Sequence, residues 1–237
     1  PLDHLLGGGI ERGTSTIVVG PPGTGKSTVA AQFAAAAAER GEHAAMFIFD
    51  ESRNTLLSRA VGLGIDLAPH LESGRLTIQQ VDPAELSPGE FSHAIRNAVE
   101  RDNAAIVVLD SLNGYLNAMP EERFLNIQLH EILAYLGQKG VATLLVAAHQ
   151  GLIGPAMTTP VDATYLADMV VLLRYFEARG EIRQAISVIK RRGGQHERTI
   201  REFRLESGGI RLGEQRFCDI GCSSCHSGNT EPLTTMN

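Results

Sequence analysis

The sequence predicts an α/β fold with a mainly parallel central sheet, flanked by helices and extended at one edge by antiparallel strands. Apolar runs of strand length alternate with helix-spaced segments as far as Ala148, which is the pattern of parallel βαβ units. A glycine-rich loop joins the first strand to the first helix. Beyond Met169, strand-like runs follow one another with only short polar turns between them. With 237 residues, 43% of them hydrophobic, the chain can bury one sizeable core.

The parallel part of the sheet is predicted from buried apolar runs and from the helices between them. Connections of this kind cross over with a right hand and place helices on both faces of the sheet. The expected strands are Thr16–Val19, Ala44–Phe49, Leu76–Val81, Ala105–Leu109 and Ala142–Ala148. The expected helices are Ser27–Arg40, Thr55–Leu63, Phe91–Glu100 and Arg123–Gln138.

The antiparallel part is predicted from three runs without helices between them: Val170–Tyr175, Ile182–Ile189 and Thr199–Leu205. Antiparallel strands can be joined by short turns, so we expect these runs to pair with one another and to extend one edge of the sheet. The folded domain should span residues 1–214. Residues 215–237 become rich in Ser, Thr and Gly after Ser223, and we expect them to form a disordered tail.

Composition narrows the classes of function. The formal net charge of −6 disfavours a surface built to hold nucleic-acid backbones. The longest apolar runs, such as Val141–Ala148, are too short to cross a bilayer, and no signal peptide is recognisable. Cys218, Cys222 and Cys225 all lie near the C-terminus, so the core needs no disulfide. That usage suits a reducing compartment, and we expect a cytoplasmic protein.

The strongest signal is the glycine-rich loop after the first strand. It fits the pattern GxxxxGK[ST] in the required strand–loop–helix context, with the residues Gly20, Pro21, Pro22, Gly23, Thr24, Gly25, Lys26 and Ser27. The backbone N–H groups of such a loop point at a phosphate together with the following helix N-terminus. We expect Lys26 to contact the β- and γ-phosphates, Ser27 to ligate Mg²⁺ and Thr28 to reach the α-phosphate. The loop therefore predicts binding of ATP with Mg²⁺.

Carboxylates follow two strands that should end at the same edge of the sheet. Asp110 takes the Walker B position, where an acid can hold Mg²⁺-bound water opposite Ser27; elsewhere a lone Asp at a strand end is commonly a turn former. Asp50 and Glu51 end the neighbouring strand and should face the same crevice. We assign Glu51 as the base that activates water and Asp50 to the metal shell, with their order open. A helix N-cap formed by Asp50 or Ser52 is the alternative.

In this order, the loop, the acidic pair and the Walker B aspartate resemble those of the RecA-like P-loop NTPases, and within them the KaiC family of circadian-clock ATPases. The resemblance runs from Leu2 to about Glu214. Its matching stretches include Leu5-Leu6-Gly7-Gly8-Gly9-Ile10 and Leu109-Asp110-Ser111-Leu112. The more specific ones are Asp50-Glu51-Ser52-Arg53 and the set formed by Lys190-Arg191-Arg192, His196 and Ile200-Arg201-Glu202-Phe203. KaiC proteins usually carry two such domains in tandem, and this chain looks like the second. Since Pro1 replaces an initiator Met, we expect it to be cut from a longer chain.

The resemblance implies a hexameric ring with ATP bound between subunits. A cationic segment of one subunit would reach the nucleotide of its neighbour, in keeping with charge stabilisation during phosphoryl transfer. The residues of this predicted trans-acting set are Lys190, Arg191, Arg192, Gly194, His196 and Arg198. An ordinary solvated basic turn is the alternative reading of the same residues.

Some positions depart from the family pattern. In clock KaiC the second domain phosphorylates itself on adjacent Ser and Thr residues, and the matching residues here are Thr164 and Tyr165. Thr164 is therefore a candidate phosphate acceptor, and an autokinase cycle is an open alternative. Leu63 stands where the family has an aromatic residue that stacks on adenine, so its contact with the base should be looser. Gln150, after the last parallel strand, is a candidate γ-phosphate sensor.

DNA recombination of the RecA type is disfavoured. The loops that would bind DNA are Ser111–Glu122 and Gly151–Thr164; the first contains no Lys or Arg, and the second contains none either. Binding of a strand generally needs cations for the backbone as well as aromatic side chains for the bases. We expect the second loop, Gly151–Thr164, to line the pore of a ring and not to bind DNA.

Two questions stay open at this level. A nucleotide-gated scaffold with little turnover, signalling to a regulatory protein partner, would carry the same motifs as an ATPase. In the tail, Cys218, Cys222, Cys225 and His226 are candidate zinc ligands, but adjacent Cys225 and His226 would be strained as joint ligands. An oxidisable tail without metal is the favoured interpretation.

Overall fold

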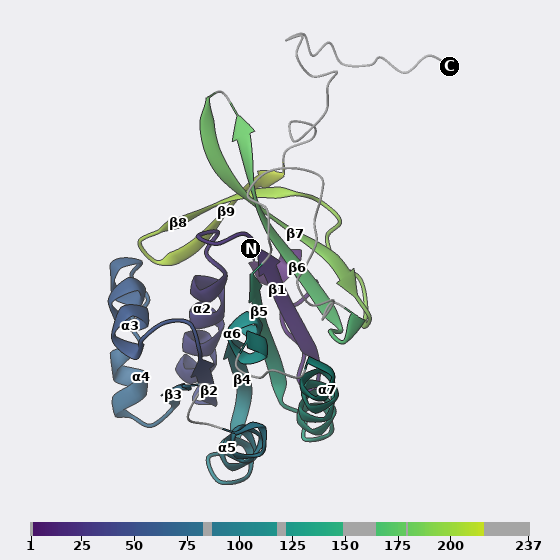
Figure 1. Cartoon of the computed structure of the whole chain (residues 1–237). Helices are drawn as coiled ribbons and strands as arrows, with labels where there is room; N and C mark the ends of the chain where they lie inside the picture. The colour runs from purple at the N-terminus through teal and green to yellow at the C-terminus, as the bar shows by residue number, and fades with distance from the viewer. Residues whose placement is uncertain (1, 83–86, 118–121, 149–164, 179, 216–237) are drawn as a thin grey trace.

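The computed structural model of the chain describes residues 2–82, 87–117, 122–148, 165–178 and 180–215 (Figure 1). Its helices are α1 (Leu2–Leu5), α2 (Lys26–Glu39), α3 (Arg53–Gly62), α4 (Ala68–Glu72), α5 (Pro88–Glu100), α6 (Leu112–Asn117) and α7 (Glu122–Gln138). Its strands are β1 (Ser15–Gly20), β2 (His43–Ile48), β3 (Leu76–Gln80), β4 (Ala104–Asp110), β5 (Ala142–Ala148), β6 (Met169–Ala178), β7 (Glu181–Arg191), β8 (Arg201–Glu206) and β9 (Gly209–Gln215).

The described strands form one nine-stranded sheet in the order β3-β2-β4-β5-β1-β6-β7-β8-β9. Neighbours from β3 to β6 run parallel, and those from β6 to β9 run antiparallel. In Figure 1 the long β6–β7 pair lies beside β1, and the β8–β9 pair curves from it over α2 toward α3. The predicted fold class, a mainly parallel sheet extended at one edge by antiparallel strands, is confirmed.

Two cores cover the two faces of this sheet, because alternate residues of a strand point to opposite faces. Val18 and Met46 pack on one face, against α2, α3 and the N-terminal segment. Ile17 and Phe47 pack on the other face, against α5, α6 and α7. The parallel strands are therefore apolar on both sides, which explains why they appear in the sequence as continuous runs.

Local sequence explains where the main helices begin. The Ser52 hydroxyl accepts a hydrogen bond from the Thr55 amide at 3.1 Å and caps α3. Ser87 and Glu90 form a reciprocal capping box at the start of α5. Helix α2 follows Gly25, whose left-handed φ of 93° favours glycine. Such caps place the starts of α3 and α5, at Arg53 and Pro88, ahead of the predicted starts at Thr55 and Phe91.

Four elements were not predicted: α1, α4, α6 and β9. Helix α6 lies within Ser111–Glu122, so the prediction of a continuous loop there was wrong. Strand β9 pairs with β8 and reaches Gln215, one residue past the predicted domain limit. Gln150, Thr164, the predicted pore loop and the cysteine tail lie outside the described residues. Within the described ranges, no helix has the length and apolar character needed to span a membrane.

Candidate functional site

The glycine-rich loop and the predicted acids lie at one edge of the sheet, as expected for parallel strands. Gly20 at the end of β1 is paired with Ala148 of β5. Asp110 at the end of β4 is paired with Ile48 of β2 and with Val146 of β5. Asp50 and Glu51 follow β2 after Phe49, so the sheet register brings the predicted loop and acids to the carboxyl ends of the parallel strands.

The loop is folded on itself around buried polar side chains. The Lys26 ammonium donates to the Pro21 carbonyl at 2.8 Å, and the Thr24 hydroxyl donates to the same oxygen at 2.8 Å. Burial lowers the pKa of Lys26 to about 8, while the charge of Asp110 opposes this shift. A buried ammonium held by a neutral carbonyl and one carboxylate is suited to accept an anionic partner.

Asp110 is the most deeply buried acid of the site, with 6% of its surface exposed. Burial raises the pKa of its carboxyl to about 6, against a hydrogen bond from Ser27 that lowers it. Its Oδ2 is buried and has no hydrogen-bond partner within the described part of the chain. An orphaned carboxylate oxygen beside the Ser27 hydroxyl fits water bound to Mg²⁺.

The other carboxylates make the surroundings suitable for a cation but do not form a cage. The charges of Glu51 and Asp50 also raise the pKa of Asp110, so the three acids lie close enough to interact. Among the described residues, no three His, Cys, Asp or Glu side chains converge as a ready-made metal site. Mg²⁺ keeps several waters and typically uses one or two protein groups together with substrate phosphates; Ser27 and Asp110 are two such groups.

Asp50 is fixed by the segment that follows Asp110. The Ser111 hydroxyl donates to Asp50 Oδ2, and Ser111 Oγ in turn accepts from the Gly114 amide at 3.2 Å. A Cβ on Gly114 would lie 2.6 Å from Asp50 Oδ1 and 2.5 Å from Phe49 Cβ, so glycine is required where α6 passes the acid. The unpredicted helix α6 thus helps to position Asp50.

Glu51 has a partner that sequence analysis missed. Its two carboxylate oxygens accept from Arg59 Nη1 and Nη2 of α3, each at 2.7 Å. The cap of α3 is made by Ser52, so capping and a role for Glu51 in the site coexist. The two residues are eight positions apart, with the Ser52 cap and the first turns of α3 between them, and no short spacing rule joins them.

A cavity of about 460 Å³ opens beside the loop. Its walls include Lys26, Ser27 and Thr28 from the loop and α2, Arg59 and Leu63 from the α3 region, and Leu205 of β8. The Leu63 carbonyl accepts from the Gly208 and Gly209 amides at 2.8 and 3.1 Å, which ties the β8–β9 turn to the end of α3. Leu63, the residue predicted to contact the base, lines this cavity. Leu205 was not predicted, because its position depends on how the antiparallel strands fold over the loop.

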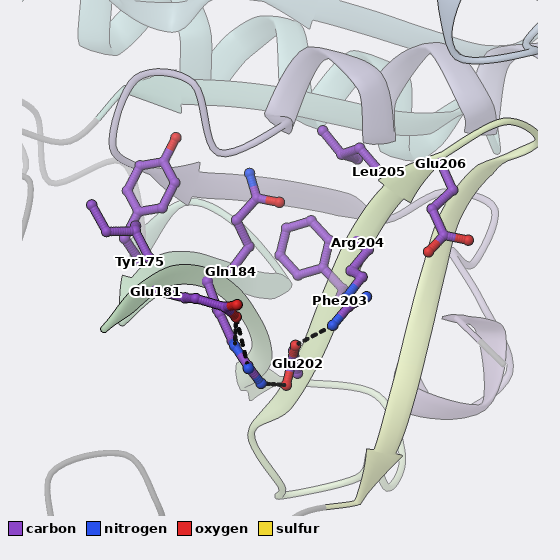
Figure 2. A pocket seen from close by; sticks show the side chains of 10 residues that line it. Tyr175, Glu181, Gln184, Glu202, Phe203, Arg204, Leu205 and Glu206 are labelled. Carbon is purple, nitrogen blue, oxygen red and sulfur yellow. Dashed lines mark hydrogen bonds and ion pairs between the residues drawn. The ribbon is translucent and has the colours of Figure 1, made fainter. Parts of the chain in front are cut away.

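A second cavity, of about 600 Å³, lies between β7 and β8 (Figure 2). Arg183 bridges Glu181 and Glu202 at 2.8 and 3.4 Å, so the charged groups in its wall are largely paired. On its rim, the Tyr175 hydroxyl donates to the Pro22 carbonyl at 3.3 Å and Gln184 Nε2 to the Gly23 carbonyl at 3.5 Å. Side chains of β6 and β7 therefore hold the backbone of the phosphate loop through hydrogen bonds to its carbonyls.

The predicted trans-acting set lies near the amino ends of the parallel strands, whereas the loop and the acids lie at their carboxyl ends. Arg191 is paired with Met169, which is beside Thr16 at the start of β1, whereas the loop follows the end of β1. Lys190 donates to the Ala167 carbonyl at 2.7 Å. Arg192, whose side chain is 56% exposed, contacts the Tyr165 carbonyl at 2.9 Å and Asp168 at 3.3 Å. These cations cannot complete the site of their own chain.

Arg191, a member of the predicted trans-acting set, is held by contacts within its own chain. Its side chain is only 6% exposed. It donates to the carbonyls of Leu6 and Gly193 and forms an ion pair with Glu11, so it holds the N-terminal segment within its own chain. In the connection that follows, Gly194 has a left-handed φ of 89°, His196 is half-buried and Arg198 is exposed.

Comparison with known proteins agrees with the fold. The family model of the KaiC ATPases matches residues 1–216. The chain is 28% identical over 213 residues to the circadian clock protein KaiC3 of Synechocystis sp., covering 90% of this chain and 42% of that protein. It is 27% identical over 208 residues to the circadian clock oscillator protein KaiC of Synechococcus elongatus, covering 88% of this chain and 40% of that protein.

The chain thus spans less than half the length of these relatives. The family match covers the loop, the acids after β2, Asp110 at the end of β4, and the antiparallel extension in one continuous stretch. The chain belongs to the KaiC family of ATPases.

Proposed function

We propose that this domain binds ATP with Mg²⁺ and hydrolyses it, in a site that a neighbouring subunit completes. The observation that carries the proposal is the convergence of Lys26, Ser27 and Asp110: the first two line the cavity, and the buried Asp110, with one orphaned oxygen, interacts with both of them. This set offers a cation for phosphates and a hydroxyl–carboxylate pair for metal-bound water. The acids after β2 lie at the same sheet edge and supply groups that can activate water.

Each residue has a distinct part in the proposed reaction. The loop amides and Lys26 hold the β- and γ-phosphates, and Thr28 lies next to them in the wall of the cavity. Bound Mg²⁺ would neutralise charge on the phosphate oxygens. Ser27 and Asp110 would hold the ion, with Asp50 fixed in the outer shell by Ser111. Glu51 would accept the proton of the attacking water.

The neighbouring subunit would supply cations that this chain cannot bring to its own site. Lys190 and Arg192 lie at the edge of the sheet opposite the phosphate loop, where they can face the loop of an adjacent copy. A repeated head-to-tail contact of this type closes a ring when the rotation allows it. We therefore propose a hexameric ring with nucleotide at each interface, with Lys190, Arg192 and His196 acting in trans. By analogy with clock relatives, its output would be regulatory.

Turnover of ATP by the purified chain tests the enzymatic part of this proposal. Glu51→Gln should lower kcat by about 10²-fold or more, because it removes the base and keeps the size of the side chain. Lys26→Ala should abolish saturable nucleotide binding, because it removes the buried cation of the loop. If the wild-type chain releases phosphate no faster than the Glu51→Gln variant while both bind ATP, hydrolysis is wrong. A nucleotide-gated scaffold then explains the site better.

A further inference from the structure

We propose that Arg59 is a positioning residue that exchanges partners when nucleotide enters: it leaves the carboxylate of Glu51 and binds a phosphate. This inference rests on the proposed function, since Glu51 is taken as the water-activating base. It adds a coupling between occupancy of the cavity and availability of that base. Arg59 was not singled out from the sequence.

The geometry places Arg59 between two anion sites. On one side, its guanidinium meets both oxygens of Glu51 at 2.7 Å. On the other, Arg59 lines the nucleotide cavity together with Lys26 and Ser27. The side chain of Arg59 is 36% exposed and that of Glu51 is 17% exposed, so the arginine has open space toward the cavity while the carboxylate is mostly enclosed.

The two anions compete for the same group because carboxylate and phosphate match the guanidinium fork equally well. Arg59 interacts with the carboxylates of Glu51 and Asp110, and its charge lowers the pKa of Asp110 while the charges of Glu51 and Asp50 raise it. A nucleotide would add several negative charges beside Lys26. The guanidinium then gains by turning toward the phosphates.

Release of Glu51 has a consequence for the reaction. In the ion pair, each carboxylate oxygen already accepts an N–H group of Arg59, which leaves fewer lone pairs for a hydrogen bond from the attacking water. Once Arg59 moves to a phosphate, Glu51 is freed at the moment when its substrate is present. The base is thus withheld while the cavity contains no nucleotide and offered when nucleotide binds.

The prediction is a coupling between two substitutions, measured as equilibrium affinity for a fluorescent ADP analogue with Mg²⁺. Glu51→Gln should tighten binding about fivefold, since Arg59 is no longer held by a carboxylate. Arg59→Ala should weaken binding about tenfold, since it loses the phosphate contact. In the Arg59→Ala background, Glu51→Gln should change the affinity by less than about twofold.

Two outcomes overturn the inference. Equal tightening by Glu51→Gln in both backgrounds would show that removal of negative charge acts through space and not through Arg59. A fall in kcat for Arg59→Ala with unchanged affinity would show that Arg59 only orients Glu51. Arg59→Lys keeps the charge without the fork and serves if the alanine variant does not fold; it should bind less tightly than wild type.

The same measurements separate failure of this inference from failure of the proposed function. Lys26→Ala is the reference for loss of the site. If the wild-type chain shows no binding that Lys26→Ala removes, the nucleotide site itself is wrong. If that binding is present but the coupling between Glu51 and Arg59 is absent, the site stands and only the exchange of partners is wrong.

Discussion

The carboxylate of Asp110 is buried, and the residues around it satisfy only part of its hydrogen-bonding capacity. Its carboxylate is buried at the end of β4, one oxygen receives the Ser27 hydroxyl, and the other has no hydrogen-bond partner within the described chain. Burying a carboxylate without full hydrogen bonding costs free energy. The raised pKa of Asp110, about 6, expresses that cost. A cation beside Ser27 would offset it.

We expect Asp110→Asn to stabilise the chain at pH 7 in the absence of Mg²⁺ and nucleotide. The folded-state pKa lies above the ordinary value of 3.8, so the free energy of unfolding falls as pH rises from about 4 to about 6. The amide avoids this loss. Because Lys26 loses its charged neighbour, the net gain at pH 7 should be about 1–2 kcal/mol, visible as a higher midpoint in urea unfolding.

The pH dependence and a matched variant identify the cause. The advantage of Asp110→Asn should shrink toward zero below about pH 4, where the wild-type carboxyl is protonated in both states. Asp102→Asn, at an exposed position before β4, should change stability by less than about 0.5 kcal/mol at either pH. Equal destabilisation of Asp110→Asn at pH 4 and pH 7 would contradict the burial argument.

For the candidate site, the sequence predicted which residues take part better than it predicted their hydrogen-bond partners. The loop residues and Asp110 follow from a motif and a strand end, and both are found at the expected sheet edge. The Glu51–Arg59 pair depends on the path of the chain between β2 and α3, and the Asp50–Ser111 contact depends on the pairing of β2 with β4. Neither contact has a fixed sequence spacing from which it could be inferred.

Among the elements, the N-terminal segment acts as a clip on the connection between β7 and β8. The Arg191 guanidinium contacts the Leu6 carbonyl and Glu11, and the Glu197 amide donates to the Leu5 carbonyl at 3.2 Å. The Glu197 carboxylate also accepts two bonds from Arg201 at 2.7 and 2.8 Å. This network holds the segment that carries His196 and Arg198.

Removal of the clip should destabilise the chain. Arg191→Ala deletes a buried guanidinium and leaves the Leu6 carbonyl without this donor, so we expect a loss of about 1–3 kcal/mol. For a domain of this size, that corresponds to a fall of roughly 3–10 °C in the thermal midpoint. Differential scanning calorimetry of the purified chain measures it directly.

Arg12→Ala is the control from the same segment. The Arg12 side chain is 63% exposed and pairs with Glu42 at 2.8 Å, and an exposed pair contributes about 0–1 kcal/mol. Its midpoint should therefore stay close to that of the wild type. A similar fall for both variants would argue against a special role for Arg191.

The unpredicted elements were missed for physical reasons that differ from one to another. Helices α1 and α4 are four and five residues long, too short to show a helical period. Helix α6 contains a glycine in its middle that serves the Asp50 contact and weakens helix propensity. Strand β9 has few apolar residues because it is the edge strand of the described sheet. The buried parallel strands, in contrast, were evident as apolar runs.

In the whole molecule, the phosphate loop and Arg192 lie at opposite ends of the parallel strands. Variants of the two can therefore be mixed in a complementation experiment. Lys26→Ala disables the phosphate loop but keeps Arg192, while Arg192→Ala keeps the loop but lacks the cation that would act on a neighbour. Each variant alone should hydrolyse ATP slowly. In a randomly mixed ring, about a quarter of the interfaces in an equimolar mixture join an intact loop to an intact Arg192.

ATP turnover of the mixture should therefore recover to about a quarter of the wild-type rate, above the mean of the two variants. Sedimentation with and without ATP shows whether mixed rings are present, and subunits must be exchanged or refolded together before the assay. Asn54→Ala, at an exposed position of α3, replaces Arg192→Ala in a control mixture and should give about half of the wild-type rate if the Lys26→Ala subunits only dilute active loops. Action of Arg192 across the interface is excluded if the Arg192→Ala variant alone hydrolyses ATP at the wild-type rate. It is also excluded if mixed rings hydrolyse ATP no faster than the mean of the two variants. Because Arg192 and the loop lie at opposite edges of one chain, recovery in the mixture requires contact between two copies.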